Sequence, residues 1–128
     1  MNVQPEVLEM LRQWVRKAEH DLEAAKPYDT ACFHCQQVVE KYLKALLTRL
    51  GIPAPRTHDL ERLAALLPAE QRLSVPVARL VAINPYAVDV RYADDWREPD
   101  RDEAIHALET AEAVRAEALS LLPKEVVA

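Results

Sequence analysis

The segment from Ala31 to Leu50, ACFHCQQVVEKYLKALLTRL, constrains the fold more than any other part of the chain. Its apolar residues recur at steps of three and four, as on one face of an α-helix, and further apolar residues widen this stripe. A helix that is apolar over so much of its circumference has to be surrounded. Asp29 or Thr30 can cap its start, and Gly51, the only glycine, stands where a left-handed residue would end it. The segment therefore predicts the central helix of a bundle.

Two further long helices are predicted on either side of this segment. Apolar residues alternate at steps of three and four from Leu8 to Ala25, which predicts a first amphipathic helix. Towards the other end, Asp100 is followed three residues later by Glu103, the pattern of a capping box at a helix start. This last helix should run to about Leu122, because Pro123 ends it.

The connection between the central and last helices should be shorter and less regular. Thr57 can cap a third helix that extends from Leu60 to Leu67. Helical spacing continues from Gln71 to Ile83, where Pro76 either kinks the segment or starts a second piece, so we expect a short or broken helix. From Asn84 to Pro99 the periodicity lapses, which predicts an irregular region, and loops of this kind commonly carry function.

The composition favours an all-α fold in one domain over residues 1–128. Few residues are aromatic, glycine occurs once, and the nine prolines fall between the periodic segments rather than inside them. The expected architecture is an up-down antiparallel bundle of the four-helix type, with one or two additional short helices.

The charge balance limits the classes of partner. The formal net charge of −5 argues against a general nucleic-acid coat, because phosphate binding needs clustered Lys and Arg, so DNA is not expected as a partner. A local basic groove for RNA stays open. The sequence has no apolar run as long as a membrane span and no signal peptide at its start, so we expect a cytoplasmic protein without a membrane partner.

Several familiar chemistries find no basis in the sequence. Cys32 and Cys35 form a CxxC pair inside the central helix, where they are expected to be small core residues. One glycine cannot build a phosphate-binding loop or a dinucleotide fingerprint. The acidic cluster from Asp94 to Glu103 is largely explained by helix capping and the helix dipole. We therefore expect neither a bound metal nor a cofactor.

Several short motifs of the sequence together resemble those of a known family. They are FHCQQVVEKYLKALL in the central helix, the Gly-Ile-Pro loop after it, Thr57-His58-Asp59-Leu60, the upstream Ala18-Glu19-His20-Asp21-Leu22, and Arg91-Tyr92. In this order they are similar to the HEPN family, the nucleotide-binding domains of higher eukaryotes and prokaryotes. The resemblance implies an up-down bundle, commonly a homodimer, that often acts with a small nucleotidyltransferase in a two-protein module of the toxin-antitoxin kind.

The resemblance also brings in a ribonuclease signature, in which an Arg and a polar residue precede a His. Arg101 and His106 match its spacing. In such an enzyme the His moves the proton of the ribose 2′-hydroxyl and the Arg stabilises charge on the phosphate, without a metal. The acidic residues around Arg101 weaken this interpretation, because like charges repel an RNA phosphate.

The interpretation that we favour is a nucleotide- or RNA-binding bundle that acts with a nucleotidyltransferase partner. Lys41 and Lys44 lie one turn apart and can present two ammonium groups to a phosphate, and Tyr92 can stack on a base. Two alternatives remain: a metal-independent endoribonuclease that uses Arg101 and His106, and a non-catalytic structural adaptor. The full set of candidate nucleotide- or RNA-binding residues is His34, Lys41, Lys44, His58, Arg91 and Tyr92.

Overall fold

The computed structural model describes residues 3–23, 28–87 and 99–127. Within these ranges the chain forms α-helices and short 3-10 segments and contains no strand, so the predicted all-α fold is confirmed. None of the helices described there combines the length and apolar character that a membrane span requires. The elements are α1 (Pro5–Glu23), α2 (Tyr28–Arg49), α3 (Leu60–Ala65), η1 (Ala69–Gln71), α4 (Val77–Ile83), η2 (Asn84–Ala87), α5 (Arg101–Leu121) and α6 (Lys124–Val127).

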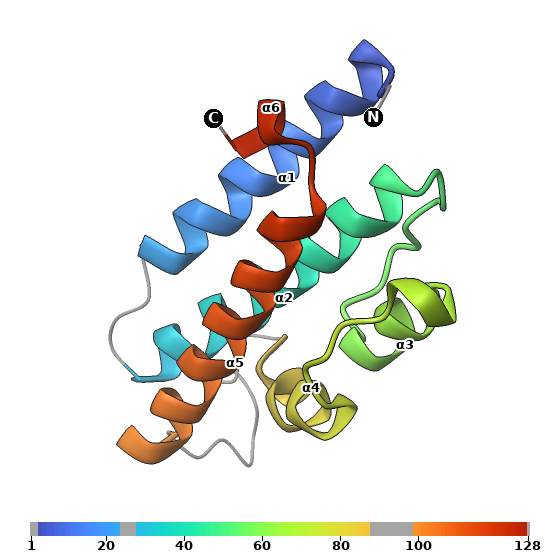
Figure 1. The fold of residues 1–128 in the computed structure, drawn as a ribbon. Helices are drawn as coiled ribbons and strands as arrows, with labels where there is room; N and C mark the ends of the chain where they lie inside the picture. The colour runs from blue at the N-terminus through green and yellow to red at the C-terminus, as the bar shows by residue number, and fades with distance from the viewer. Residues whose placement is uncertain (1–2, 24–27, 88–98, 128) are drawn as a thin grey trace.

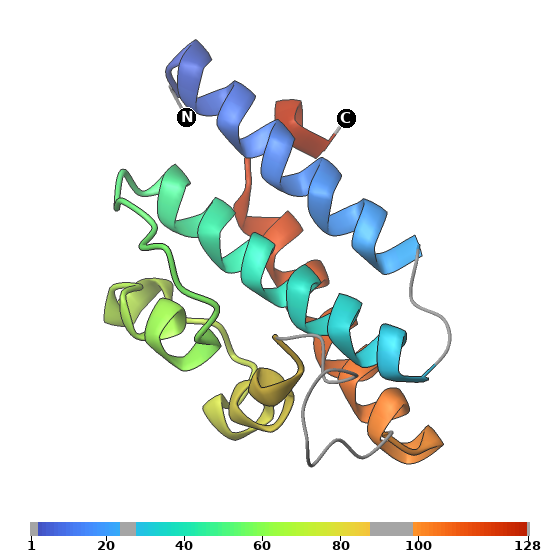
Figure 2. The same cartoon turned by 180° about the vertical axis from the view of Figure 1, so that it is seen from behind.

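Helix α2 lies at the centre of the bundle, as its apolar circumference predicts. It contacts α1 and α5 along most of its length, and α3, α4 and η2 pack on its remaining side. Figures 1 and 2 show that α1 runs antiparallel to α2, whereas α5 runs in the same direction as α2. The two short helices α3 and α4 form the returning leg between them. The path is therefore up-down, with one of the four legs broken into two pieces.

Small side chains line the face of α5 that packs against the bundle. Because alanine fills so little space, the backbones of two helices can approach closely wherever it lies between them. Val114 adds one larger side chain to this face and is completely buried. Deleting or adding methylene groups in such a closely packed interface costs stability, because interiors are packed at crystal-like density. The buried alanines of α5 are Ala104, Ala107, Ala111 and Ala118.

One hydrogen-bonded group joins the three long helices. The ring of Tyr42 on α2 is completely buried, and its hydroxyl donates to Oε1 of Glu19 on α1 at 3.2 Å. Nε of Arg115 on α5 donates to the same carboxylate at 2.9 Å. Burial and the neighbouring Glu19 raise the pKa of Tyr42, so its hydroxyl remains a neutral donor. The hydrogen bond to Glu19 raises the pKa of Arg115 as well.

The two ends of α2 differ in how well the sequence predicts them. The helix already begins at Tyr28, so the expected cap at Asp29 or Thr30 is wrong and both residues belong to its first turn. At the other end Gly51 has a φ of 73°. The Ile52 amide donates to the Leu47 carbonyl at 2.9 Å, and the Gly51 amide donates to the Thr48 carbonyl at 3.1 Å. This is a Schellman motif, which requires the left-handed residue that glycine supplies.

The shorter helices begin close to the predicted residues. Asp59, rather than Thr57, caps α3, because its carboxylate accepts from two amides of the first turn. Pro76 starts α4 and does not kink a longer helix. The Asp100 cap of α5 is confirmed, since its carboxylate accepts from the Glu103 amide at 2.8 Å. Helix α6 was not expected; its Val126 is buried and the helix contacts α1.

Candidate functional site

The predicted binding residues of α2 are His34, Lys41 and Lys44. Helical steps bring His34 and Lys41 onto one stripe, and both are half-buried. Residues on the other sides of α2 are buried against α1, α5 and the α3–α4 leg. We call this region the α2 surface. It consists of His34, Lys41 and Lys44 of α2, Trp14 and Lys17 of α1, and His58 of the loop before α3.

A buried carboxylate organises the α2 surface. Glu40 is only 4% exposed, and its two oxygens have different partners. Oε1 lies 2.8 Å from Nδ1 of His58, and Oε2 lies 3.1 Å from Nζ of Lys44, which is itself buried. Since an unpaired buried charge is costly, this pairing explains why Lys44 turns inward. The ammonium group of Lys44 is therefore paired with Glu40, and its main role in the α2 surface is to hold that carboxylate in place.

The neighbouring Gln36 fixes the loop that carries His58. Gln36 is completely buried, and its Nε2 donates to the backbone carbonyl of His58 at 2.9 Å. An ionised Glu40 can only accept hydrogen bonds, so Nδ1 of His58 is the donor in their contact. The side chain of His58 is nevertheless 63% exposed. The network thus sets the tautomer of the imidazole and leaves Nε2 available to a ligand.

Trp14 extends this network onto α1, and the sequence alone did not single it out for function. Nζ of Lys44 lies 5.5 Å from the centre of its ring, and Nζ of the exposed Lys17 lies 5.1 Å from it. Both distances suit cation–π contacts. The signals that could have revealed this group are the position of Trp14 at the edge of the apolar stripe and a lysine three residues after it.

Of the predicted binding residues, Lys44 and His58 are joined through Glu40, whereas His34 and Lys41 share a stripe of α2 by helical spacing alone. The ring of His34 is edge-on to that of Phe33, with 5.3 Å between the ring centres. The two remaining candidates, Arg91 and Tyr92, lie outside the described residues.

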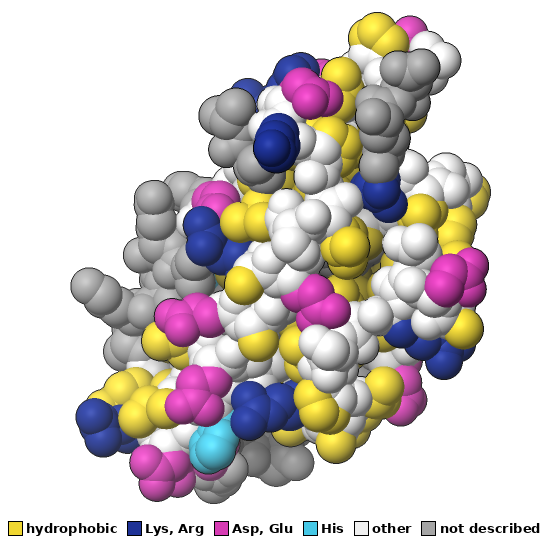
Figure 3. All heavy atoms as spheres, in the orientation of Figure 1, with side chains coloured by type: hydrophobic (Ala, Val, Ile, Leu, Met, Phe, Trp, Pro, Cys, Tyr) yellow, Lys and Arg dark blue, Asp and Glu magenta, His cyan; other side chains and the backbone are white. Residues whose placement is uncertain are grey.

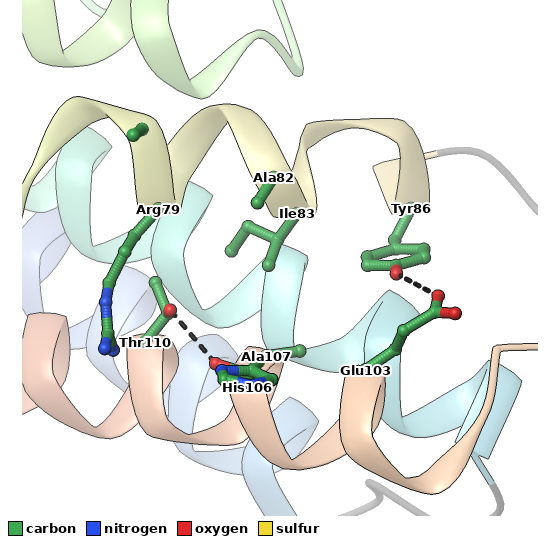
Figure 4. Close-up of a pocket in the computed structure, with 9 residues that line it drawn as sticks. Arg79, Ala82, Ile83, Tyr86, Glu103, His106, Ala107 and Thr110 are labelled. Carbon is green, nitrogen blue, oxygen red and sulfur yellow. Dashed lines mark hydrogen bonds between the residues drawn. The ribbon is translucent and has the colours of Figure 1, made fainter.

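A groove between α4 and α5 forms a second region, mostly apolar, and it contains one of the two residues of the ribonuclease signature. Its volume is about 360 Å³. His106 lies in it, but Arg101, at the first turn of α5, is not among the residues that line the groove. Arg79 faces it from α4 and was missed by the sequence analysis, because nothing in its local sequence marks it (Figure 4). The lining residues are Ala78, Arg79, Ala82, Ile83, Tyr86, Glu103, His106, Ala107 and Thr110.

The two ends of the α4–α5 groove differ in charge. Figure 4 shows Arg79 extending from α4 to the side of the groove where Thr110 and His106 lie. At the other end the hydroxyl of Tyr86 donates to Oε2 of Glu103 at 2.9 Å. The groove therefore carries basic groups at one end and a carboxylate at the other.

The surface next to the groove is acidic. Figure 3 shows Asp and Glu side chains over the length of α5. Glu109 and Glu112 of this helix are exposed. Arg101 itself lies between Asp100 and Asp102, and all three are exposed. This arrangement disfavours a long polyanion on the α5 side of the bundle.

The two cysteines lie in the core, as predicted, and their thiols are not reactive groups. Burial raises the pKa of Cys32 to about 11 and that of Cys35 to about 12, so both are protonated near neutral pH. Among the residues that the structure describes, no three His, Cys, Asp or Glu side chains are placed to hold a metal ion.

The fold is an all-α helical bundle, and comparison with known proteins gives its family. The family model described as the HEPN domain matches residues 11–121, and the chain belongs to the HEPN family. It is thus a helical domain of a class associated with binding nucleotides or RNA. No curated protein matches the sequence.

A solved structure supports this assignment of the fold. The chain is similar to TT1696 from Thermus thermophilus, whose crystal structure it matches with a TM-score of 0.71 and 28% sequence identity. The match covers 88% of this chain and 98% of that one.

Proposed function

We propose that the chain binds nucleotides or RNA through the α2 surface and acts beside a small nucleotidyltransferase. The observation that carries the proposal is the continuous polar row in which Lys17, Trp14, Lys44, Glu40 and His58 join α1, α2 and the loop before α3. Such a row holds its donors in place before a ligand arrives, which lowers the entropic cost of binding.

The distribution of charge favours an anionic ligand at this surface. The chain as a whole is acidic, with a net charge of −5. On the α2 surface, however, Glu40 is buried and paired with Lys44, so the exposed Lys17 adds a positive charge to a locally neutralised site. The ammonium groups of Lys17 and Lys41 can contact phosphate oxygens, and Nε2 of His58 can accept from a hydroxyl or amino group of the ligand.

The partner and the assembly rest on family membership and not on a contact within this chain. Members of the HEPN family often act with a small nucleotidyltransferase and commonly form homodimers. We propose the same two-protein module here, in which the chain presents its bound nucleotide or RNA to the transferase. Co-elution of the two proteins in size-exclusion chromatography, against each protein alone, tests the association, and light scattering of the isolated chain tests the dimer.

The binding experiment compares two double variants that remove the same charge from different surfaces. Lys17→Ala with Lys41→Ala alters the α2 surface. Arg12→Ala with Arg16→Ala is the control, because both arginines lie on an exposed side of α1 beside Glu9. Binding of labelled single-stranded RNA is measured by fluorescence anisotropy at several salt concentrations. The first variant should lower the salt slope by about 0.7 for each lost phosphate contact, and the control should keep it.

Two results would contradict the proposal. Equal losses in both variants would mean that net charge, rather than the α2 surface, controls binding. Absence of saturable binding by the native chain to RNA and to nucleotides would favour the alternative of a structural adaptor. The endoribonuclease alternative has less support from the geometry, because Arg101 does not line the groove that holds His106.

A further inference from the structure

His58 and Glu40 form a histidine–carboxylate pair in which the carboxylate is buried and the imidazole is exposed. Glu40 is 4% exposed, whereas the side chain of His58 is 63% exposed. Nδ1 of His58 lies 2.8 Å from Oε1 of Glu40. Nε2, the other ring nitrogen, has no hydrogen-bond partner among the residues that the structure describes. The ring is therefore held through Nδ1, and Nε2 is the nitrogen on its exposed side.

The buried carboxylate determines the chemistry of Nε2. An ionised carboxylate only accepts hydrogen bonds, so Nδ1 carries the proton and Nε2 keeps a lone pair. The lone pair of an exposed imidazole is a nucleophile. When this nitrogen forms a bond, the ring becomes positively charged, and a carboxylate bonded to Nδ1 stabilises that charge. His58 therefore has the arrangement of a nucleophilic histidine.

The loop that carries His58 is held in place through its backbone as well as through the ring. Nε2 of the buried Gln36 donates to the His58 carbonyl at 2.9 Å. The second oxygen of Glu40 lies 3.1 Å from Nζ of Lys44, which fixes the orientation of the carboxylate. In the next position along the chain, Asp59 caps α3. A nucleophile that is fixed before the reaction loses little entropy in the transition state.

The groups around His58 favour a phosphoryl group as the electrophile. Among the described residues no hydroxyl or thiol is hydrogen-bonded to Nε2, so this nitrogen has no side chain to activate and is itself the reacting atom. Arg56 of the same loop is exposed and has no partner within the described ranges. Lys44 lies on the other side of Glu40. These cations can compensate the negative charge that a phosphoryl group brings.

We propose that His58 is a phosphoryl acceptor, which takes the group on Nε2 from an activated phosphate of the phosphoramidate or acyl phosphate class. The lone pair of Nε2 forms the bond to phosphorus. The bond from phosphorus to the leaving group breaks, and its electron pair leaves with ammonia or with a carboxylate. Nδ1 keeps its proton, and Glu40 stabilises the positively charged ring. The transfer does not depend on RNA binding, although His58 belongs to the α2 surface.

The first test treats the intact chain with potassium phosphoramidate at mildly alkaline pH, where phosphohistidine is stable. His106 is the internal control, because it is also exposed but its ring has no carboxylate partner among the described residues. Peptide mass spectrometry follows both histidines, and phosphorus NMR identifies the ring nitrogen. His58 should react faster than His106 by about tenfold or more, and at Nε2 only, because its bond to a charged carboxylate strengthens as the ring becomes positive. Equal rates, or a product on Nδ1 of His58, would overturn the proposal.

The second test removes the charge of Glu40. Glu40→Gln keeps the size of the side chain but cannot stabilise a positive ring, so the rate at His58 should fall to about that of His106. Since this variant leaves Lys44 unpaired, Glu40→Gln with Lys44→Met is measured beside it, and circular dichroism shows whether each is folded. An unchanged rate at His58 in either folded variant would contradict the role of Glu40.

Unfolding the native chain in urea gives the same comparison without a substitution. The contact between His58 and Glu40 joins residues that are distant in the sequence, so it is lost on unfolding. The two histidines should then react at equal rates. A faster reaction of His58 that persists in urea would assign its reactivity to the local sequence and not to the buried carboxylate.

The effect of the modification on RNA binding rests on the proposed function. A phosphoryl group on His58 adds negative charge to the α2 surface, so the phosphorylated chain should bind labelled RNA more weakly than the untreated chain. His58→Ala should bind RNA equally before and after the same treatment. Equal affinity of the native chain before and after phosphorylation would contradict this regulation. A native chain that binds no RNA would contradict the proposed function, and the rates at His58 and His106 decide the transfer in either case.

Discussion

The α2 surface and the α4–α5 groove both contain basic residues, but they treat their charges differently. On the α2 surface a buried carboxylate holds Lys44 and His58, and a buried amide holds the loop behind them. In the groove Arg79 and His106 approach one another without a partner among the described residues. On the α2 surface Glu40, Lys44 and His58 therefore hold one another in place, whereas no such network holds Arg79 and His106 within the described residues.

This difference separates two roles that sequence reasoning treats alike. A paired and buried charge is kept for the position that it gives to its neighbours, and removing one member leaves the other without compensation. An exposed and unpaired charge contributes little to stability. Mutation of the buried Glu40 should therefore lower stability, whereas mutation of the exposed Arg79 should leave it nearly unchanged.

The largest expected effect is on the α2 surface. Glu40→Ala leaves the buried ammonium group of Lys44 unpaired and releases His58, so the free energy of unfolding should fall by about 3 kcal/mol. Arg79→Ala in the groove should change it by about 0.5 kcal/mol or less. Urea unfolding followed by circular dichroism measures both values. Replacing Glu40 and Lys44 together by leucine should recover most of the loss, whereas similar costs for Glu40→Ala and Arg79→Ala would remove the distinction.

A second prediction concerns the pH dependence of stability that the two buried cysteines of the core should cause. Burial, followed by the charge of Glu103 near the groove, raises the pKa of Cys32 from 9.0 to about 11, and burial raises that of Cys35 to about 12. The two thiols lose their protons at a lower pH in the unfolded chain than in the folded one. Their contribution to the free energy of unfolding is therefore fully present below pH 9 and is lost as the pH rises towards 11 and 12. At about pH 10 each of the two thiols should lower the free energy of unfolding by about 1 kcal/mol.

The measurement is urea unfolding at about pH 8 and about pH 10 in the presence of a reductant. The double variant Cys32→Ala with Cys35→Ala should lose about 2 kcal/mol less than the native chain over this interval. Parallel losses in the two proteins would mean that other groups account for the alkaline effect.

The smallest expected effect concerns the ribonuclease signature. Arg101 and His106 are exposed, and five residues on a helix place them roughly 140° apart. We expect no cleavage of tRNA or unstructured RNA in the presence of a chelator, and no difference between the native chain, Arg101→Ala and His106→Ala. Cleavage by the native chain that both folded variants lose would instead assign these residues as an active site and reverse the roles of the two regions.

Much of the fold is predictable because the residues that start and end its helices act through local interactions. Pro76 and Asp100 start helices, and Gly51 ends one, through interactions within a few residues of each position. The cap of α3 was misplaced by two residues, since Thr57 and Asp59 are both suitable caps and only the observed backbone distinguishes them.

The sites are less predictable because their partners are distant in the sequence. Glu40 and Lys44 have the spacing of an ordinary exposed pair on a helix, and only the packing of the loop with His58 buries them. Arg79 has no local signal, and its proximity to His106 arises from the packing of α4 against α5. Sequence patterns thus locate the helices but not the contacts between their polar side chains.

Gly51 indicates how this chain can vary without losing its fold. A β-carbon placed there would meet nothing within 4 Å, so glycine is required for its torsion angle and not for lack of space. Asparagine also adopts left-handed torsions, whereas β-branched residues do not. The position therefore restricts substitution through its backbone conformation, although a β-carbon would have room there.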